Sequence, residues 1–431
     1  MDIKKIIKSN IFKDSFWMLL GSALGKGLGV IGGIFIANIL GKDLYGEYGL
    51  LRNTLLLIAI FSTMGLGYTS TVFVARYYNH NLSILKLLIK KLIRITFYFS
   101  FIVAIITFIF SSKLAVYLED PNLESGLKYL SLIIIFNALT TTQVGVLSGF
   151  KAFKDIAIVN ILSGTINFTL SVGLTYKFGF NGAVIALLLS QILNFLLNKI
   201  ALHKQFKNIP DSYNETIHLE EILKSSLPIA LQEMSVSVMH WSTSILLLKL
   251  TNYGEVGLYS ASTQWSTIIL FIPVVLRNVT LSHLSSAKNN LKKRNRIIYS
   301  MLILYVICTF TPSTFVYIFS ENIVSVYDVS FNGLKYVLVL ACYSTVFNSI
   351  YNVFSSEFIA SGRNWLMYVI TFCRDILILL LLYILINICK LSGAFSLALS
   401  NLSVGLIVSL VCWLSYLYFS SQYNYGKNGQ K

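Results

Sequence analysis

Long apolar runs, separated by short polar loops, fill most of this 431-residue chain. Each run is about 20 residues or longer, the length that an α-helix needs to cross the hydrocarbon core of a bilayer. We therefore predict an all-α membrane protein with about twelve transmembrane helices. The predicted spans are residues 15–40, 48–74, 90–111, 127–149, 155–177, 180–202, 225–250, 256–284, 297–319, 334–360, 364–389 and 391–419.

The composition supports a lipid environment over a soluble core. Hydrophobic residues make up 55% of the chain and charged residues only 12%, with a mean hydropathy of +0.71. Soluble domains carry about 25% charged residues, because much of their surface must face water. The five cysteines all lie in apolar runs and none shows CxxC spacing. We interpret them as small buried hydrophobes and expect no metal site.

The net charge of +16 is distributed as in a multi-pass membrane protein. A nucleic-acid-binding protein concentrates Lys and Arg in one patch of a soluble surface. Here they lie in the short gaps between apolar runs, so we expect no nucleic-acid partner. With the N-terminus in the cytoplasm, 23 of the 34 Lys and Arg residues fall in cytoplasmic segments and seven in segments on the other side. This bias follows the positive-inside rule and predicts that both termini are cytoplasmic.

Short glycine motifs recur at a shift near 211 residues. Residues 46–48 (GEY) correspond to 257–259 (GLY), and residues 182–183 (GA) correspond to 393–394 (GA). Chance recurrence is the alternative, but two parallel repeats with a site between them are a transporter architecture. The repeat predicts two pseudo-symmetric six-helix bundles joined by a linker. These are an N-terminal lobe over 1–203, a cytoplasmic linker over 204–224 and a C-terminal lobe over 225–431.

The short loops limit the chemistry that the chain can carry out. No loop exceeds about 22 residues, whereas a membrane-embedded polysaccharide polymerase needs a large extramembrane loop to hold sugars and catalytic groups. A P-loop motif GxxxxGK[ST] is also absent from the sequence, which argues against ATP hydrolysis. We therefore expect a transporter and not an enzyme, with no catalytic residues and no cofactor, driven by a gradient or by the supply of substrate.

Three basic residues within predicted spans have no acidic residue in the same stretch, and a charged side chain there costs about 2.5–3.5 kcal/mol on insertion scales. Lys26 lies in the first span, Arg52 in the second and Arg277 in the eighth. Such residues usually face a bundle interior or a water-filled cavity, so we predict a cationic cavity between the lobes. This cavity favours an anionic ligand, because Arg binds phosphate with two parallel hydrogen bonds. The alternative is that these side chains extend to the membrane interface.

Three further ionisable residues are candidates for a coupling site or a structural ion pair. Arg374 and Asp375 are neighbours in the eleventh span, where each can pair with a residue of another helix. Glu233 lies in the seventh span, two turns from His240 on the same face. A buried carboxylate can carry a proton or bind Na⁺, so coupling to a proton or sodium gradient is one interpretation. A hydrogen-bonded structural role is the other.

Several motifs resemble those of Wzx-type flippases for O-antigen and other polysaccharide repeat units. They are residues 17–22 (WMLLGS), 40–48 (LGKDLYGEY) and 253–259 (YGEVGLY). These flippases belong to the multidrug/oligosaccharidyl-lipid/polysaccharide exporter (MOP) superfamily, and the resemblance covers about residues 12–420. It implies a two-lobed bundle that works by alternating access. It also implies transfer of undecaprenyl-diphosphate-linked oligosaccharide from the cytoplasmic to the periplasmic leaflet of the bacterial inner membrane.

The resemblance also implies a binding site and partners. Lipid II flippases of this superfamily carry cationic residues in the first, second and eighth helices, where Lys26, Arg52 and Arg277 stand here. We therefore predict that these three residues bind the diphosphate. The implied pathway is lipopolysaccharide biosynthesis or that of another surface polysaccharide. An O-antigen polymerase and a chain-length regulator are candidate protein partners, alongside the lipid bilayer.

Two positions depart from the pattern of the family. Asn38 stands where members often carry Arg or Lys, and residues 241–244 (WSTS) lack the Asp that many members have late in the seventh helix. The second departure puts an acidic site in the seventh helix in doubt. It bears on the rival function, a multidrug or cation antiporter of the same superfamily, because such a transporter prefers acidic cavity residues.

Overall fold

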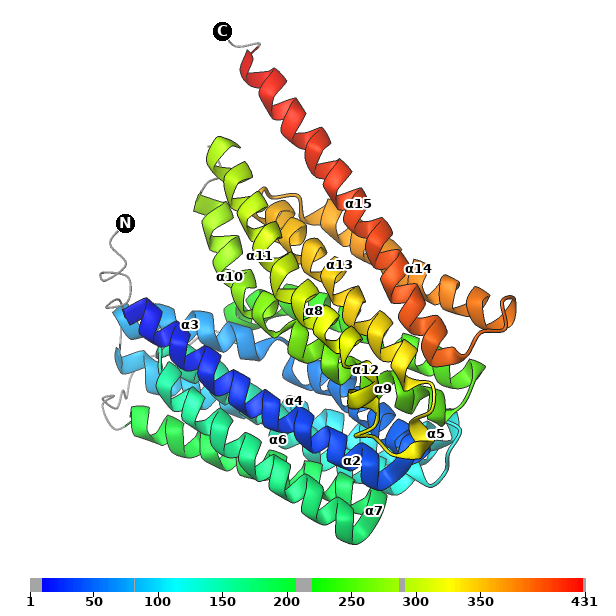
Figure 1. Ribbon diagram of the computed structural model, residues 1–431. Helices are drawn as coiled ribbons and strands as arrows, with labels where there is room; N and C mark the ends of the chain where they lie inside the picture. The colour runs from blue at the N-terminus through cyan, green and yellow to red at the C-terminus, as the bar shows by residue number, and fades with distance from the viewer. Residues whose placement is uncertain (1–9, 81, 207–218, 287–290, 429–431) are drawn as a thin grey trace. The chain divides into compact units, whose positions relative to one another are not determined.

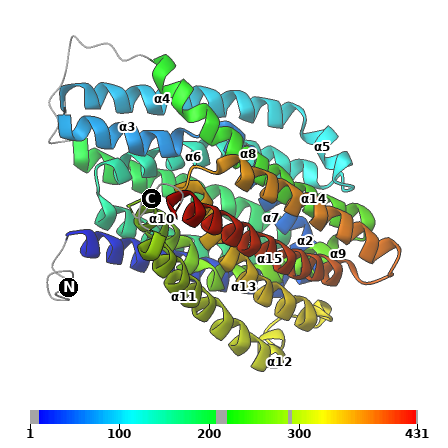
Figure 2. The ribbon, with the colours of Figure 1, turned by 90° about the horizontal axis from the view of Figure 1, so that it is seen from above.

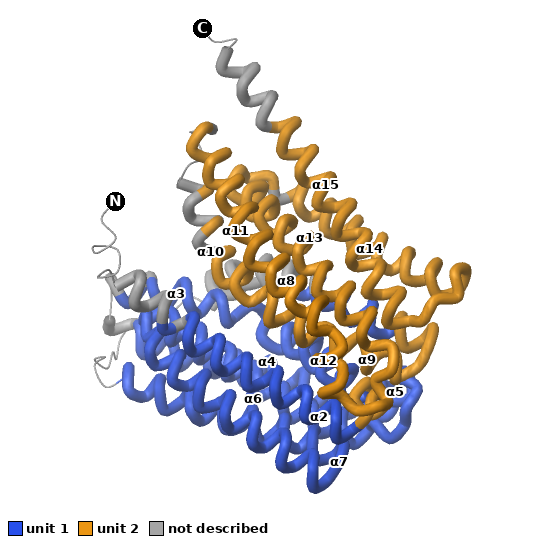
Figure 3. The backbone as a smooth tube through the Cα atoms, viewed as in Figure 1, with its two compact units in different colours: residues 1–40, 47–245 blue, residues 41–46, 246–431 orange. Residues whose placement is uncertain are grey.

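The computed structural model describes residues 10–80, 82–206, 219–286 and 291–428, and these residues form helices joined by short connections (Figure 1). The predicted all-α fold is confirmed. The chain divides into two compact units: unit 1 comprises residues 1–40 and 47–245, and unit 2 comprises residues 41–46 and 246–431 (Figure 3).

Unit 1 is built mainly from the helices of the first half of the chain, with most of α8 added. α6 lies at its centre and packs against α3, α4 and α7. A cluster of buried side chains, including Leu66, Leu88 and Val146, fills the space between α3, α4 and α6. The helices are α2 (Asn10–Thr63), α3 (Leu66–His80), α4 (Leu82–Ile109), α5 (Ser111–Tyr117), α6 (Leu123–Gly149), α7 (Phe153–Phe206) and α8 (Leu219–Leu250).

Unit 2 is built around α13, which packs against α9, α11 and α15. α11, α13 and α15 lie side by side in both ribbon views (Figures 1 and 2). The ring of Phe354 on α13 contacts the rings of Trp413 and Tyr416 on α15. The elements are α9 (Tyr253–Ile269), α10 (Phe271–Ser286), α11 (Leu291–Ile318), α12 (Ser320–Val324), the 3₁₀ helix η1 (Val329–Phe331), α13 (Leu334–Ala360), α14 (Asn364–Asn387) and α15 (Gly393–Asn428).

The order of helices repeats between the two halves of the chain. α4 and α11 each have 28 residues, and each is followed by a short helix, α5 or α12. Next come α6 and α13, which have 27 residues each and lie at the centres of their units. A broken span precedes each series: the chain breaks before α3 and again before α10. This order agrees with the repeat that the glycine motifs predict.

The predicted spans fall on helices, although α7 contains two whole spans and α2 contains the first span and the beginning of the second. α2 bends at Gly41 (φ 71°) and α7 bends at Gly179 (φ 58°), and each helix has 54 residues. Among the described residues, eight helices are long and apolar enough to cross a membrane. The number is nine when α9 and α10, bent by 53°, count as one span. α8 carries the seventh predicted span. The chain is therefore a multi-pass membrane protein.

Two predicted spans are interrupted in the structure. The span predicted at 48–74 breaks at Met64 (φ 48°) and Gly65 (φ 70°), because two successive left-handed residues cannot continue a right-handed helix. The span predicted at 256–284 breaks at Leu270, which lies between α9 and α10. Pro273 explains this second break, because proline has no N–H to bond the carbonyl of Ile269 four residues earlier.

The compact units divide the chain at other positions than the predicted lobes at 1–203 and 225–431. Most of α8, up to residue 245, belongs to unit 1, and residues 41–46 belong to unit 2. Much of the predicted linker at 204–224 lies outside the described residues. The difference arises because side chains of α8 bind α2, and because the turn after Gly41 packs against α9.

Glycines bring α2 and α7 into close contact within unit 1. A Cβ atom at Gly25 would lie 2.6 Å from the carbonyl oxygen of Asn160, and a Cβ at Gly164 would lie 2.7 Å from the Cα of Gly25. Gly21 meets the backbone of Ala157 in the same way. Small residues allow this approach, which matters in lipid because apolar side chains gain little by leaving the bilayer for one another.

We expect Gly25→Ala to destabilise the protein by about 1–3 kcal/mol, the usual cost of an extra methyl group in a packed interface. Gly29→Ala is the matched control, because it lies one turn further along α2 and a Cβ there meets nothing within 4 Å. The control should be neutral or slightly stabilising, since Ala favours a helix over Gly by about 0.5–1 kcal/mol. Thermal unfolding in detergent measures both variants, and equal unfolding temperatures would contradict the packing described above.

Candidate functional site

The three basic residues predicted to bind an anion are all exposed. Lys26 lies on the first segment of α2 and Arg52 on its second segment, after the bend at Gly41. Arg277 lies on α10. Lys26 and Arg52 belong to unit 1, whereas Arg277 belongs to unit 2, so the structure brings two of the three into one compact unit. Their role in binding a diphosphate stays a prediction.

Hydrogen bonds between α2 and α8 fix the orientation of Arg52. The amide of Asn53 donates to the hydroxyl of Ser244 (Nδ2–Oγ 3.2 Å), and the indole N–H of Trp241 donates to Thr54 (Nε1–Oγ1 3.1 Å). Successive residues of an α-helix are about 100° apart. Because Asn53 and Thr54 face α8, Arg52 points to the other side of α2. The sequence did not indicate this polar contact between two distant helices.

Arg277 lies on a helix that is anchored by a buried hydrogen bond. The hydroxyls of Thr280 on α10 and Tyr305 on α11 are 2.9 Å apart, and both residues are buried. Arg277 lies one turn before Thr280 and is near enough to interact electrostatically with the phenol of Tyr305. Arg277 also follows Pro273 by one turn, so the break between α9 and α10 sets the direction of the segment that carries it.

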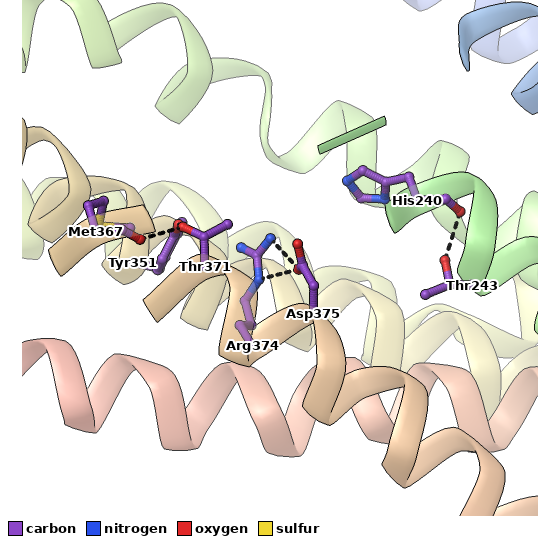
Figure 4. Close-up of polar contacts among 7 residues, drawn as sticks. All are labelled: His240, Thr243, Tyr351, Met367, Thr371, Arg374 and Asp375. Carbon is purple, nitrogen blue, oxygen red and sulfur yellow. Dashed lines mark hydrogen bonds and ion pairs between the residues drawn. The ribbon is translucent and has the colours of Figure 1, made fainter. Parts of the chain in front are cut away.

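Arg374 and Asp375 form an ion pair with each other (Figure 4). Nη2 and Nε of Arg374 lie 2.8 and 2.9 Å from Oδ1 of Asp375. The guanidinium carbon also lies 4.9 Å from the ring centroid of Tyr351, whose hydroxyl is 2.7 Å from that of Thr371. Pairing of each charge with a residue of another helix was one interpretation of the sequence. Their direct pairing neutralises both charges inside unit 2, between α13 and α14.

The remaining coupling candidate cannot be placed at the level of its side chain. Glu233 lies on α8, and its side chain lies outside the described residues. His240, on the same helix, is exposed, and its carbonyl oxygen accepts hydrogen bonds from the hydroxyls of Thr243 (2.8 Å) and Ser244 (3.2 Å) (Figure 4 shows the first). The described residues contain no group of three or more His, Cys, Asp or Glu that could hold a metal ion.

A buried ion pair in unit 2 was missed from the sequence. Arg294, at the start of α11, binds Glu357, near the end of α13, and Glu357 is completely buried. Arg294 lies in the loop between the predicted spans 256–284 and 297–319, and Glu357 lies near the end of the predicted span 334–360. The guanidinium of Arg363 packs on the ring of Phe419 nearby, with its carbon 3.9 Å from the ring centroid. The partners are 63 residues apart, and such a pair leaves no local pattern.

The fold is that of MOP-superfamily transporters. The inward-facing conformation of a multidrug resistance MATE family transporter of this superfamily is similar over 92% of this chain and 98% of its own, with a TM-score of 0.75 and 15% identity. A MOP superfamily transporter from Pyrococcus furiosus, described as having a binding pocket of reverse polarity that suggests a different function, is similar over 94% of this chain and 95% of its own. Its TM-score is 0.66 and its identity 16%.

The chain belongs to the polysaccharide biosynthesis protein family, which matches residues 11–281. An uncharacterized membrane protein of Methanocaldococcus jannaschii is 22% identical over 418 residues, which cover 92% of this chain and 97% of that protein. The predicted resemblance is therefore confirmed for the polysaccharide biosynthesis protein family and for the fold.

We expect Glu357→Ala to destabilise the protein by about 3–5 kcal/mol, because it leaves the charge of Arg294 buried without its partner. Replacing both residues, as Arg294→Met with Glu357→Leu, should recover most of that loss, since apolar side chains of similar size often substitute well for a buried pair. Thermal unfolding in detergent compares the single and double variants. If the double variant is no more stable than Glu357→Ala, the buried pair does not account for the loss.

Proposed function

We propose that this protein is a flippase that moves undecaprenyl-diphosphate-linked O-antigen, or another surface polysaccharide repeat unit, from the cytoplasmic to the periplasmic leaflet by alternating access. Its membership of the polysaccharide biosynthesis protein family and its MOP fold support a transporter of polysaccharide intermediates. Lys26, Arg52 and Arg277 bind the diphosphate, which is the anionic part common to all such substrates. The membrane is the bacterial inner membrane.

The observation that carries this proposal is the difference between basic and acidic residues within the spans. Arg52 and Arg277 are exposed and make no ion pair with any residue that the structure describes. The carboxylates of Asp375 and Glu357, in contrast, are both neutralised by arginines. An antiporter for organic cations needs free carboxylates in its cavity, whereas a diphosphate carrier needs free cations. The balance among the described side chains favours an anionic substrate.

The proposal extends to partners and to the driving force. Repeat units delivered to the periplasmic leaflet must be joined into polymers, so an O-antigen polymerase and a chain-length regulator are the expected partners. A proton or sodium gradient, or the supply of new substrate, drives the cycle without a bound cofactor. Glu233 remains a candidate for carrying the coupling ion. The pair of Arg374 and Asp375 is better suited to a structural role, because each charge already has its partner.

We expect Arg52→Gln and Arg277→Gln each to lower the delivery of surface glycan about 10- to 100-fold in a deletion strain that expresses the variant. This range corresponds to the loss of one hydrogen bond to a charged group, about 1.5–3 kcal/mol. Lipid-linked repeat units should accumulate in the cytoplasmic leaflet.

Arg52→Lys keeps the charge and should retain part of the activity, and Lys113→Gln, outside the predicted spans, should behave as wild type. Membrane levels of each variant, measured by immunoblot, control for folding. Normal glycan from a well-expressed variant that lacks both Arg52 and Arg277 would reject the assignment.

A further inference from the structure

Residues 41–46 form a short strap that packs inside unit 2. The strap begins at Gly41, whose positive φ of 71° bends α2 away from its first segment. Residues 40 and 47, on either side of the strap, belong to unit 1. The chain thus leaves unit 1, contacts unit 2 over six residues and returns to unit 1.

The strap meets α9 through two glycines in a reciprocal contact. A Cβ atom at Gly46 would overlap the carbonyl oxygen of Tyr253, and a Cβ at Gly257 would overlap the carbonyl oxygen of Lys42. Each glycine therefore faces the carbonyl of the residue four positions before the other glycine. This is the pattern of a two-fold symmetric contact, in which the same surface is used twice. Gly46 and Gly257 are also the residues that correspond in the sequence repeat.

Side-chain and backbone hydrogen bonds hold the strap on both sides of this contact. The side chain of Tyr45 is buried and bonds the amide of Gln264 through its hydroxyl. Its ring contacts Phe331, with ring centroids 6.1 Å apart. The backbone N–H of Lys42 donates to the hydroxyl of Ser330 (3.2 Å). Ser330 is itself positioned by Asp328, whose carboxylate accepts from the Ser330 N–H (2.9 Å).

From these contacts we infer that the strap is a latch that must leave unit 2 during each transport cycle. Both of its ends continue into unit 1, so a change in the position of unit 1 pulls the strap or bends it at Gly41. The inference rests on the proposed function, because alternating access requires the two halves to move.

The contact is suited to release because it depends on backbone fit. Large apolar surfaces are not needed, because glycines at the contact let the main chains of the two segments approach each other directly. One buried side-chain hydrogen bond, between Tyr45 and Gln264, adds direction to the fit. The net contribution of such a hydrogen bond to stability is small, so the latch can stabilise the packed position of the strap and still open.

A disulfide across the latch tests the inference. A Cβ atom at position 254 would lie 2.5 Å from Oδ1 of Asp43, so cysteines in Asp43→Cys with Gly254→Cys are placed to join. The assay follows transport of a fluorescent undecaprenyl-diphosphate-linked sugar in proteoliposomes. Oxidation should lower transport at least tenfold, and dithiothreitol should restore it. Each single cysteine variant controls for reaction with the native cysteines.

A second cysteine pair tests whether a disulfide away from the strap also affects transport. Thr96 and Thr142, on α4 and α6 of unit 1, have hydroxyls 2.9 Å apart, and a disulfide in Thr96→Cys with Thr142→Cys should leave transport unchanged. Adding Gly46→Ala to the first pair should lower its disulfide yield about tenfold, because the methyl group prevents the strap from seating. Adding Gly29→Ala, where space is open, should not.

Three results would overturn the inference. If the disulfide across the latch does not form, the strap does not pack as described. If it forms and oxidised protein transports at the rate of reduced protein, the strap does not need to leave unit 2, and the flippase assignment is untouched. If Gly46→Ala lowers the yield no more than Gly29→Ala, the glycine contact does not seat the strap. A wild-type protein that moves no substrate while reduced would instead reject the proposed function.

Discussion

A bilayer offers no water to the peptide backbone, so each N–H and C=O must find its partner within the protein, and this constraint governs the whole structure. It explains why the described chain is helical and why breaks are few. The breaks that occur lie at residues suited to them: Gly41 and Gly179 bend long helices, Met64 and Gly65 end α2, and the chain before Pro273 separates α9 from α10.

The same constraint decides which features the sequence could predict. A helix that crosses lipid needs a long apolar run, so the apolar helices could be predicted from hydrophobicity, whereas the breaks within the spans 48–74 and 256–284 could not. The repeat could be found because its glycines make contacts that no larger residue permits. The left-handed conformation of Met64 could not be predicted in this way, because Met64 is not a glycine and only its neighbour Gly65 is. The division into units could not be predicted either, because it depends on long-range contacts such as that between Trp241 and Thr54.

The basic residues of the candidate site could be found from the sequence, but the buried pair of Arg294 and Glu357 could not. Lys26, Arg52 and Arg277 stand out because a single cation in an apolar run is costly. The pairing of Arg294 with Glu357 joins residues that are distant in sequence, and each one alone looks interfacial. Predicting which charges are paired therefore required the structure.

The glycine contact follows from the repeat. Duplication of a six-helix unit gives two copies of each surface, and a surface placed on the symmetry axis meets its own copy. Gly46 and Gly257 show this for the backbone, where the two copies fit each other. The basic residues are not repeated in this way, because at the same shift of 211 residues Arg52 corresponds to Thr263 and Arg277 to Leu66. The backbone contact therefore needs the same small residue in both copies, whereas the charges differ between the two halves of the chain.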